Sequence, residues 1–263
     1  MPADALLLNA DDLGLSPAVD AGIFAVWAQR AIGDSSIFAT AEDLPAVLSR
    51  AREAALPVGI HLNLTFGHPL SDPAKIPALV TAAGAFMKRG QWTTPLPAGE
   101  VQHELRGQVQ RVLSLGWTPS HLDSHHHIHA YPEILREVIA LAREFNLPVR
   151  ATTPAMRQAL RDADLPCPTH FSMAFYGEDA TVATLKRLVD ACPGGVLEVM
   201  THPGHADPSL PSSYREARAN ELTALTDRHW QAWLQARGIP VVGYGALKRE
   251  QDDSMNMTEH GMK

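Results

Sequence analysis

Apolar residues follow two alternating patterns along this chain. Short apolar runs such as 5–9 and 57–62 have the length and composition of buried strands. Longer segments such as 132–145 place their apolar residues along one stripe at helical spacing. The predicted strands are 5–9, 35–40, 57–62, 121–124, 148–151, 196–200 and 240–244. The predicted helices are 16–30, 45–54, 100–115, 132–145, 180–191 and 214–237.

This alternation of strands and helices indicates the fold class. Strands separated by helices are joined by parallel crossover connections, and six or seven such units predict an α/β chain that closes, or nearly closes, into a (β/α) barrel. An open doubly wound sheet is the alternative. The glycine fingerprints GxGxxG and GxxxxGKS/T, which would favour that alternative, do not occur in the sequence. We therefore expect a barrel.

One domain is expected over residues 1–247, because a (β/α) barrel commonly fills about this length and no linker divides it. Residues 248–263 show no periodicity and are predicted to form a disordered tail. Two long stretches, 66–97 and 152–176, are assigned to neither strands nor helices. Long loops in a compact domain either bind ligands or are plain surface insertions, and the sequence leaves both open.

The bulk composition excludes several classes of protein. With 45% hydrophobic residues and a net charge of −7, the chain is globular and has no basic surface for nucleic acid. Its two cysteines, Cys167 and Cys192, support neither a disulfide framework nor a thiolate zinc site. No signal peptide or long apolar segment is present, so we expect a cytoplasmic protein without membrane insertion. A homodimer is expected only from the general frequency of twofold assemblies.

Residues that can bind metals or transfer protons lie at or near the ends of the predicted strands. They are Asp11, Asp12, His61, Asp123, His125, Arg150 and His202. Each alone has an ordinary explanation, such as a helix cap or a hydrogen-bonded structural histidine. In a (β/α) barrel, however, the carboxyl ends of the strands meet on one face, where barrel active sites are built. The sequence therefore predicts that these residues share one site.

Histidine is abundant, with 13 residues, five of which fall between His121 and His129. Of the adjacent carboxylates Asp11 and Asp12, one can bind a metal while the other faces a bound water. A carboxylate, two imidazoles and an open position form the ligand set of a hydrolytic metal site, and zinc suits two imidazoles better than magnesium does. His125 and His129 also have the HxxxH spacing of a zinc-binding helix, but the glutamate of that motif is lacking and the segment follows a strand.

Five motifs are spread along the chain: NADDLG (9–14), GIHLNLT (59–65), HLDSHHHIH (121–129), FYGED (175–179) and LEVMTHPG (197–204). Together they resemble the YdjC-like carbohydrate deacetylase family, which includes chitooligosaccharide deacetylases and deacetylases of acetylglucosaminyl hopanoid lipids. The motifs occur in the family's order and extend over most of the chain. HLDSHHHIH is the most specific of them.

The resemblance implies a distorted (β/α) barrel of the glycoside hydrolase/deacetylase type. It also implies one divalent cation held by Asp12, His61 and His125, with Asp11 as the general base. His202 becomes the candidate acid that protonates the departing amine. Members of the family are often described as magnesium-dependent, whereas two imidazole ligands favour zinc, so Mg²⁺ and Zn²⁺ both remain open.

Further residues are candidates for roles at this site, each with an ordinary alternative. Arg150 either orients a substrate hydroxyl, pairs with Asp11 or forms a salt bridge at the barrel mouth. Asp123 either fixes the tautomer of a ligand histidine or is only a turn residue. His126 is expected to point away from the site because its neighbour is a ligand. The candidate substrate contacts are His127, His129, Tyr176 and Trp92, although most aromatic residues belong to cores.

The predicted function is removal of the N-acetyl group from a sugar containing N-acetylglucosamine, either an oligosaccharide or a glycolipid. The products are acetate and the free amino sugar, and the expected partner is this small N-acetylated sugar. One alternative is another metal-dependent barrel hydrolase, acting on a phosphoester or a cyclic amide and holding two or more metals. The other alternative is a non-catalytic protein that binds a sugar without releasing acetate.

Overall fold

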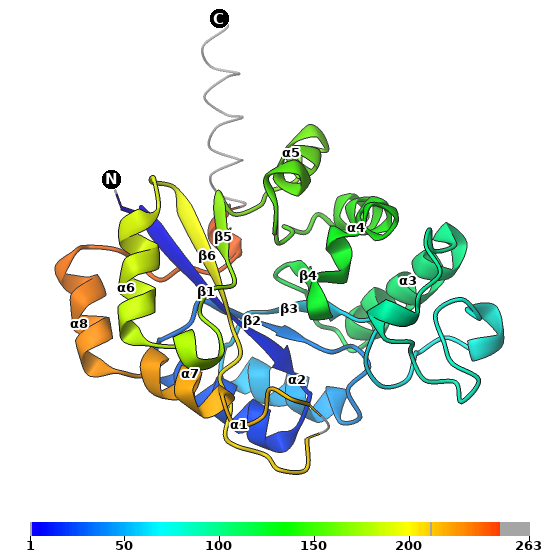
Figure 1. Ribbon diagram of the computed structural model, residues 1–263, viewed down its shortest axis with the longest axis horizontal. Helices are drawn as coiled ribbons and strands as arrows, with labels where there is room; N and C mark the ends of the chain where they lie inside the picture. Colours follow the sequence, from blue (N-terminus) through cyan, green and yellow to red (C-terminus); the bar gives the residue numbers. More distant parts are fainter. Residues whose placement is uncertain (1, 211, 248–263) are drawn as a thin grey trace, which may run out of the picture.

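The sheet at the centre of the molecule is curled and entirely parallel (Figure 1). The computed structural model describes residues 2–210 and 212–247. Six strands pair in the order β4-β3-β2-β1-β6-β5, with the bounds β1 Ala5–Leu13, β2 Asp34–Ile37, β3 Val58–Leu62, β4 Leu122–Ser124, β5 His170–Ser172 and β6 Val196–Thr201. Among the described residues β4 and β5 remain the two edges, so the sheet is half of a barrel. The prediction of a single α/β domain with a distorted barrel is confirmed in this form.

Helices connect the strands and surround the curled sheet (Figure 1). The α-helices are α1 Pro17–Ala28, α2 Leu44–Glu53, α3 Ala98–Ser114, α4 Pro132–Phe145, α5 Pro154–Asp162, α6 Val182–Ala191, α7 Arg218–Leu225 and α8 Arg228–Ala236. Short 3-10 helices lie at η1 Pro73–Lys75, η2 Arg89–Gln91, η3 His125–Ala130 and η4 Gly177–Asp179. The first four α-helices therefore match the predicted ones to within a few residues.

Two predicted strands are shorter in the structure. Segment 148–151 contributes a single bridge to β4, at Val149, and segment 240–244 contributes a single bridge to β1, at Val241. Each bridge has two backbone hydrogen bonds of 2.9–3.0 Å. Both segments thus pair with strands of the sheet, but the pairing of each is too short to form a strand.

The last predicted helix, 214–237, is two helices in the structure. α7 ends at Leu225, and the side chain of Asp227 accepts hydrogen bonds from the backbone N–H groups of His229 and Trp230, which begins α8. The unassigned stretch 152–176 contains α5 and β5. β5 was missed because it is short and half-buried throughout, so it has no clear apolar pattern.

β1 places the first candidate site residues. All of its residues after Ala5 are buried, since strands flank it on both sides. α1 begins soon afterwards, with Ser16 accepting a hydrogen bond from the backbone N–H of Val19 and Pro17 at the first helical position, as predicted. This abrupt change from strand to helix leaves the carboxylates at the carboxyl edge of the sheet.

The sequence also led to expectations about membrane insertion, the two cysteines and residues 248–263. Within the described ranges no helix is long and apolar enough to cross a membrane. Cys167 and Cys192 are both free thiols. The predicted disordered tail, 248–263, lies outside the described residues.

Gly33 lies where segment 240–244 passes the start of β2. A Cβ at this position would lie 1.9 Å from the carbonyl oxygen of Val242, far inside van der Waals contact with backbone. We therefore expect Gly33→Ala to lower the free energy of unfolding by about 3 kcal/mol, measured by urea denaturation.

Gly107→Ala in α3 is the matched control, because a Cβ there meets nothing within 4 Å. It should raise the free energy of unfolding by roughly 0.5–1 kcal/mol through helix propensity. Equal effects of the two substitutions would contradict the tight packing of segment 240–244 against β2.

Candidate active site

Two adjacent carboxylates at the end of β1 face the same cavity. Asp12 has a backbone φ of 72°, in the left-handed region that non-glycine residues rarely adopt. Successive side chains of a regular strand point to opposite faces. The turn of the backbone at Asp12 explains how both Asp11 and Asp12 line one cavity. Such strained residues are concentrated at functional sites.

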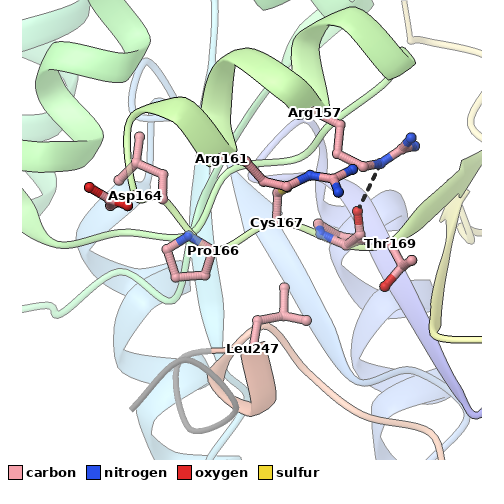
Figure 2. A pocket seen from close by; sticks show the side chains of 9 residues that line it. Arg157, Arg161, Asp164, Pro166, Cys167, Thr169 and Leu247 are labelled. Carbon is pink, nitrogen blue, oxygen red and sulfur yellow. Dashed lines mark hydrogen bonds between the residues drawn. The ribbon is translucent and has the colours of Figure 1, made fainter. Parts of the chain in front are cut away.

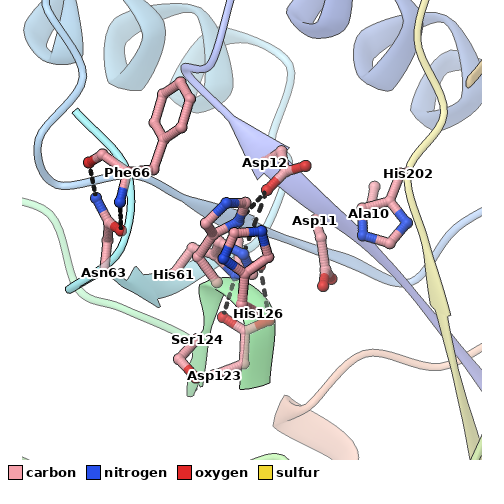
Figure 3. A network of polar contacts seen from close by, with 12 residues as sticks. Ala10, Asp11, Asp12, His61, Asn63, Phe66, Asp123, Ser124, His126 and His202 are labelled. Carbon is pink, nitrogen blue, oxygen red and sulfur yellow. Dashed lines mark hydrogen bonds and ion pairs between the residues drawn. The ribbon is translucent and has the colours of Figure 1, made fainter. Parts of the chain in front are cut away.

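Asp12, His61 and His125 form a compact cluster at this edge. Figure 3 shows Asp12 on one side of the His61 ring and Asp123 on the other. Asp12 Oδ1 lies 3.3 Å from Nε2 of His61 and 3.2 Å from Nδ1 of His125. The three ligand-type atoms all lie within 4.8 Å of one another. His61 belongs to β3 and His125 directly follows β4, so segments far apart in the sequence supply the cluster.

The cluster fits one divalent cation. Around an ion with bonds of about 2.0–2.1 Å, neighbouring ligand atoms lie about 2.9–3.4 Å apart in tetrahedral or octahedral geometry. The separations from Asp12 Oδ1 match this range. Its other oxygen, Oδ2, is held by Nη2 of Arg218 at 2.5 Å. Burial alone would raise the pKa of Asp12, but Arg218 and the imidazoles hold it well below its ordinary value. The carboxylate is therefore ionised and directed at the two rings.

Asp123 orients His61 from the other side of the ring. Its Oδ1 lies 2.8 Å from Nδ1 of His61, and its Oδ2 accepts a hydrogen bond from the hydroxyl of Ser36 at 2.9 Å. A carboxylate at Nδ1 keeps a proton there, which leaves Nε2 free to bind a metal. Burial disfavours the charged ring, yet Asp123 and Asp12 outweigh it and raise the pKa of His61 to about 10. A metal must therefore compete with a proton at Nε2.

Asp11, His61 and Asp123 form a second group of possible metal ligands, whose ligand atoms also lie within 4.8 Å of one another. The guanidinium of Arg150 already occupies it, with Nη1 2.7 Å from Asp11 Oδ2 and 2.9 Å from Asp123 Oδ2. A second cation there would meet this fixed positive charge. In the part of the chain that the structure describes, the cluster thus has room for one metal ion.

Arg150 is fully buried beneath the cavity and does not line it. Its Nη1 and Nη2 each lie 2.7 Å from an oxygen of Asp11, and its Nε lies 2.8 Å from Glu198. Of its possible roles, the structure thus places Arg150 in the ion pair with Asp11. Burial would raise the pKa of Asp11, but the guanidinium outweighs it and the pKa lies below its ordinary value.

His202 directly follows β6 and lines the same cavity. Tyr176 lies beside it, with ring centroids 5.7 Å apart in an edge-on arrangement. One face of Tyr176 stacks on Tyr214 at 3.9 Å, and the side chain is nevertheless 45% exposed. The cavity therefore has an exposed aromatic ring at its rim, next to a candidate proton donor.

The cavity has a volume of about 550 Å³ and continues into a neighbouring space of about 650 Å³. His125, His126 and Arg218 border both spaces. The two long stretches left open by the sequence contribute walls, since Arg89 comes from one and Met173 from the other. These stretches are therefore part of the cavity, in addition to any role on the surface.

A smaller hollow of about 330 Å³ lies between the end of α5, the start of β5 and Leu247 (Figure 2). Cys167 lies there with Arg157 and Arg161. Burial raises the pKa of the Cys167 thiol, although the two arginines oppose the effect. A protonated thiol is a weak nucleophile. This hollow therefore lacks the chemistry that the larger cavity has.

The structure brings most of the candidate residues together. Those that line the cavity are Asp11, Asp12, His61, His125, His127, Tyr176 and His202. His129 is fully buried instead, bonded to Ser124 and to the carbonyl of Arg150, so the expected substrate contact is not available to it. Trp92 is also buried, against Tyr131, and belongs to the core.

His126 departs from the sequence-based expectation. It was expected to point away from the site, but it lines the cavity, with Nδ1 3.0 Å from the hydroxyl of Thr65. His126 and His127 have φ values of 55° and 52°. Two left-handed residues in a row turn the chain, so adjacent side chains need not alternate as they do in a strand.

Three charged residues at the site were missed by the sequence analysis: Glu198, Arg218 and Glu221. Glu198 lies within the apolar run of β6, where a lone charge signals a buried partner. Arg218 and Glu221 lie three residues apart on the buried face of α7. These two charges interrupt the buried apolar stripe of α7, and that interruption was the sequence feature that could have identified them.

Comparisons with known proteins identify the family of this chain and a solved structure with the same fold. The profile of the YdjC-like protein family matches residues 5–236. The carbohydrate deacetylase of Geobacillus stearothermophilus is 36% identical over 90% of this chain and 96% of its own length. The chitooligosaccharide deacetylase of Salmonella paratyphi B (strain ATCC BAA-1250 / SPB7) is 35% identical over 89% and 95%, respectively. A crystal structure from Enterococcus faecalis V583, described as a "putative cellobiose-phosphate cleavage protein", has a TM-score of 0.86 at 29% identity and covers 93% of this chain and 99% of that chain.

Fold and cavity define a parallel α/β half-barrel with a polar Asp–His–His cluster at the carboxyl edge of its sheet. The match over most of the chain then gives the family. The chain belongs to the YdjC-like family, and the resemblance drawn from the five motifs is confirmed.

Asp123 acts on the cluster through His61, and its replacement tests that link. Asp123→Asn keeps the size of the side chain but removes the charge beside Nδ1 of His61. We expect the affinity for Zn²⁺ and for Mg²⁺ to fall about 10- to 100-fold, measured by calorimetric titration of metal-free protein. His127→Ala, which alters a cavity wall outside the cluster, is the control and should keep the original affinity. Undiminished affinity in Asp123→Asn would contradict the supporting role.

Proposed function

We propose that this protein is a metal-dependent hydrolase that removes the N-acetyl group from a sugar containing N-acetylglucosamine, in an oligosaccharide or a glycolipid. The products are acetate and the free amino sugar. One observation carries the proposal. The cluster of Asp12, His61 and His125, which could hold a metal, borders the same cavity as the carboxylate of Asp11 and the imidazole of His202. The names of the curated relatives support the same reaction.

Asp12, His61 and His125 are the proposed ligands of one cation, either Zn²⁺ or Mg²⁺. A bound ion of this kind polarises the acetamide carbonyl and lowers the pKa of water. Everything else in the reaction is assigned to side chains of the protein.

Asp11 is the proposed general base. It takes a proton from the water that attacks the acetyl carbon. Both of its oxygens are fixed by Arg150, and Oδ1 also accepts a hydrogen bond from the amide of Asn9 at 2.7 Å. The lowered pKa keeps Asp11 unprotonated at neutral pH, so it is available as a proton acceptor.

His202 is the proposed general acid. When the C–N bond breaks, its electron pair goes to the nitrogen, and an amide anion is too basic to leave without a proton. His202 lines the cavity and can supply that proton, so the amine departs neutral. Asp11 and His202 thus divide the two proton transfers between them.

Tyr176 and His127 are the proposed substrate contacts. The exposed ring of Tyr176 offers a flat apolar surface of the kind on which a pyranose packs. His127 lines the cavity, and its Nδ1 has no hydrogen-bond partner among the described residues. Burial lowers the pKa of His127 to about 3, so the neutral ring can contact sugar hydroxyls. Among the residues that the structure describes, the cluster has room for one cation, which disfavours a phosphoesterase with several metals.

The test is acetate release from N,N'-diacetylchitobiose by purified protein, before and after chelation and with Zn²⁺ or Mg²⁺ restored. We expect release that is lost with the chelator and returns with metal. Asp11→Asn should bind metal normally but release acetate at least about 100-fold more slowly, because only the proton transfer is removed.

His61→Ala is the companion variant and should lose both metal and activity. Absence of acetate from chitobiose, longer chitooligosaccharides and an N-acetylglucosaminyl glycolipid, together with tight sugar binding, would establish the non-catalytic alternative instead. Two metal ions per chain would favour the other hydrolases.

A further inference from the structure

Glu221 is a buried carboxylate of α7 that the proposed reaction does not yet use. Its side chain has no exposed surface. It accepts hydrogen bonds from the backbone N–H of His202 and from the hydroxyl of Tyr214. Its Oε1 also lies 3.6 Å from Nδ1 of His202. Two of these three contacts are with His202, the proposed acid.

The His202 ring presents its two nitrogens to different surroundings. Nδ1 is buried and has no hydrogen-bond partner within ordinary distance in the described part of the chain, and Oε1 of Glu221 faces it at 3.6 Å. The side chain still lines the cavity. Nε2 is therefore the nitrogen that can serve a substrate, provided that Nδ1 keeps its own proton.

We propose that Glu221 is a positioning residue that holds the proton on Nδ1 of His202 and thereby assigns Nε2 to proton donation. This role rests on the proposed function. In the reaction, Nε2–H gives its proton to the sugar nitrogen as the C–N bond breaks and its electron pair passes to that nitrogen. The ring is left neutral, with its remaining proton on Nδ1 facing Glu221.

The position of Glu221 on α7 supports this role. Arg218, three residues earlier on the same face, holds Oδ2 of Asp12 at 2.5 Å. One helix thus contacts both the cluster of Asp12, His61 and His125 and the proposed acid. Tyr214 shares oxygen Oε1 of Glu221 and accepts a hydrogen bond from the backbone N–H of Gly177 at 2.8 Å, which fixes the carboxylate in place.

A purely structural role is the alternative. Through the backbone N–H of His202, Glu221 would then only tie the loop after β6 to α7. The two roles predict different effects of a Glu221 substitution on substrates with different leaving groups. In amide hydrolysis the departing nitrogen must receive a proton. In the hydrolysis of 4-nitrophenyl acetate, the leaving group departs as a stable anion and needs no proton. A positioning role affects the amide alone, and a structural role affects both substrates.

The experiment compares Glu221→Gln, His202→Ala and the double variant with the metal-loaded wild type. We expect kcat on N,N'-diacetylchitobiose to fall about 100-fold in each single variant, with KM, metal content and ester hydrolysis within about threefold. Because Glu221 acts only through His202, the double variant should be no slower than His202→Ala. Glu216→Gln, the same change at an exposed carboxylate, should behave as wild type.

Glu221→Asp keeps the charge on a shorter side chain and should recover part of the amide activity; it also serves if Glu221→Gln does not fold. Equal losses on amide and ester, loss of metal, or additive effects in the double variant would overturn the positioning role. Wild-type amide activity in Glu221→Gln would overturn it too, while leaving the proposed function intact. A wild type that releases no acetate from any N-acetyl sugar would overturn both.

Discussion

The ion cluster around Arg150 is the interaction on which the rest of this structure depends. Its guanidinium has no exposed surface and contacts carboxylates of β1, β4 and β6, namely Asp11, Asp123 and Glu198. Such carboxylates could not be buried alone, because each would lack its hydration. Tyr244 completes the cluster with a hydrogen bond to Glu198 at 2.7 Å. Removing one partner of a buried cluster like this costs about 3–5 kcal/mol, so the two halves of the curled sheet are joined by a strong constraint.

The site is built outward from this cluster as a chain of opposite charges. Arg150 contacts Asp123, Asp123 contacts His61, and His61 contacts Asp12, which Arg218 holds from the far side. Each carboxylate therefore lies between two basic groups. This arrangement explains how Asp12 and Asp123 remain ionised although they are buried at the end of an apolar sheet.

Chemistry and recognition come from different parts of the fold. The cluster and Asp11 lie on strands or directly after them, where the backbone is fixed by neighbouring strands. The outer walls come from the segments without regular patterns, including Arg89, Met173 and Tyr176. In the proposed reaction, this division keeps the reacting groups rigid and leaves the outer walls of the cavity on connecting segments.

The sequence by itself determined the α/β class, most helices and the convergence of Asp12, His61 and His125, because apolar periodicity is local and parallel strands end at one edge. Only the tertiary structure decided which residues surround them. Arg218 and Glu221 reach the site through the packing of α7, and Arg150 and His129 are withdrawn beneath it. The half-barrel form was likewise decided by long-range pairing, since segment 148–151 has a strand's pattern but only one bridge. Side-chain contacts between distant segments depend on how elements pack, and no local pattern encodes that.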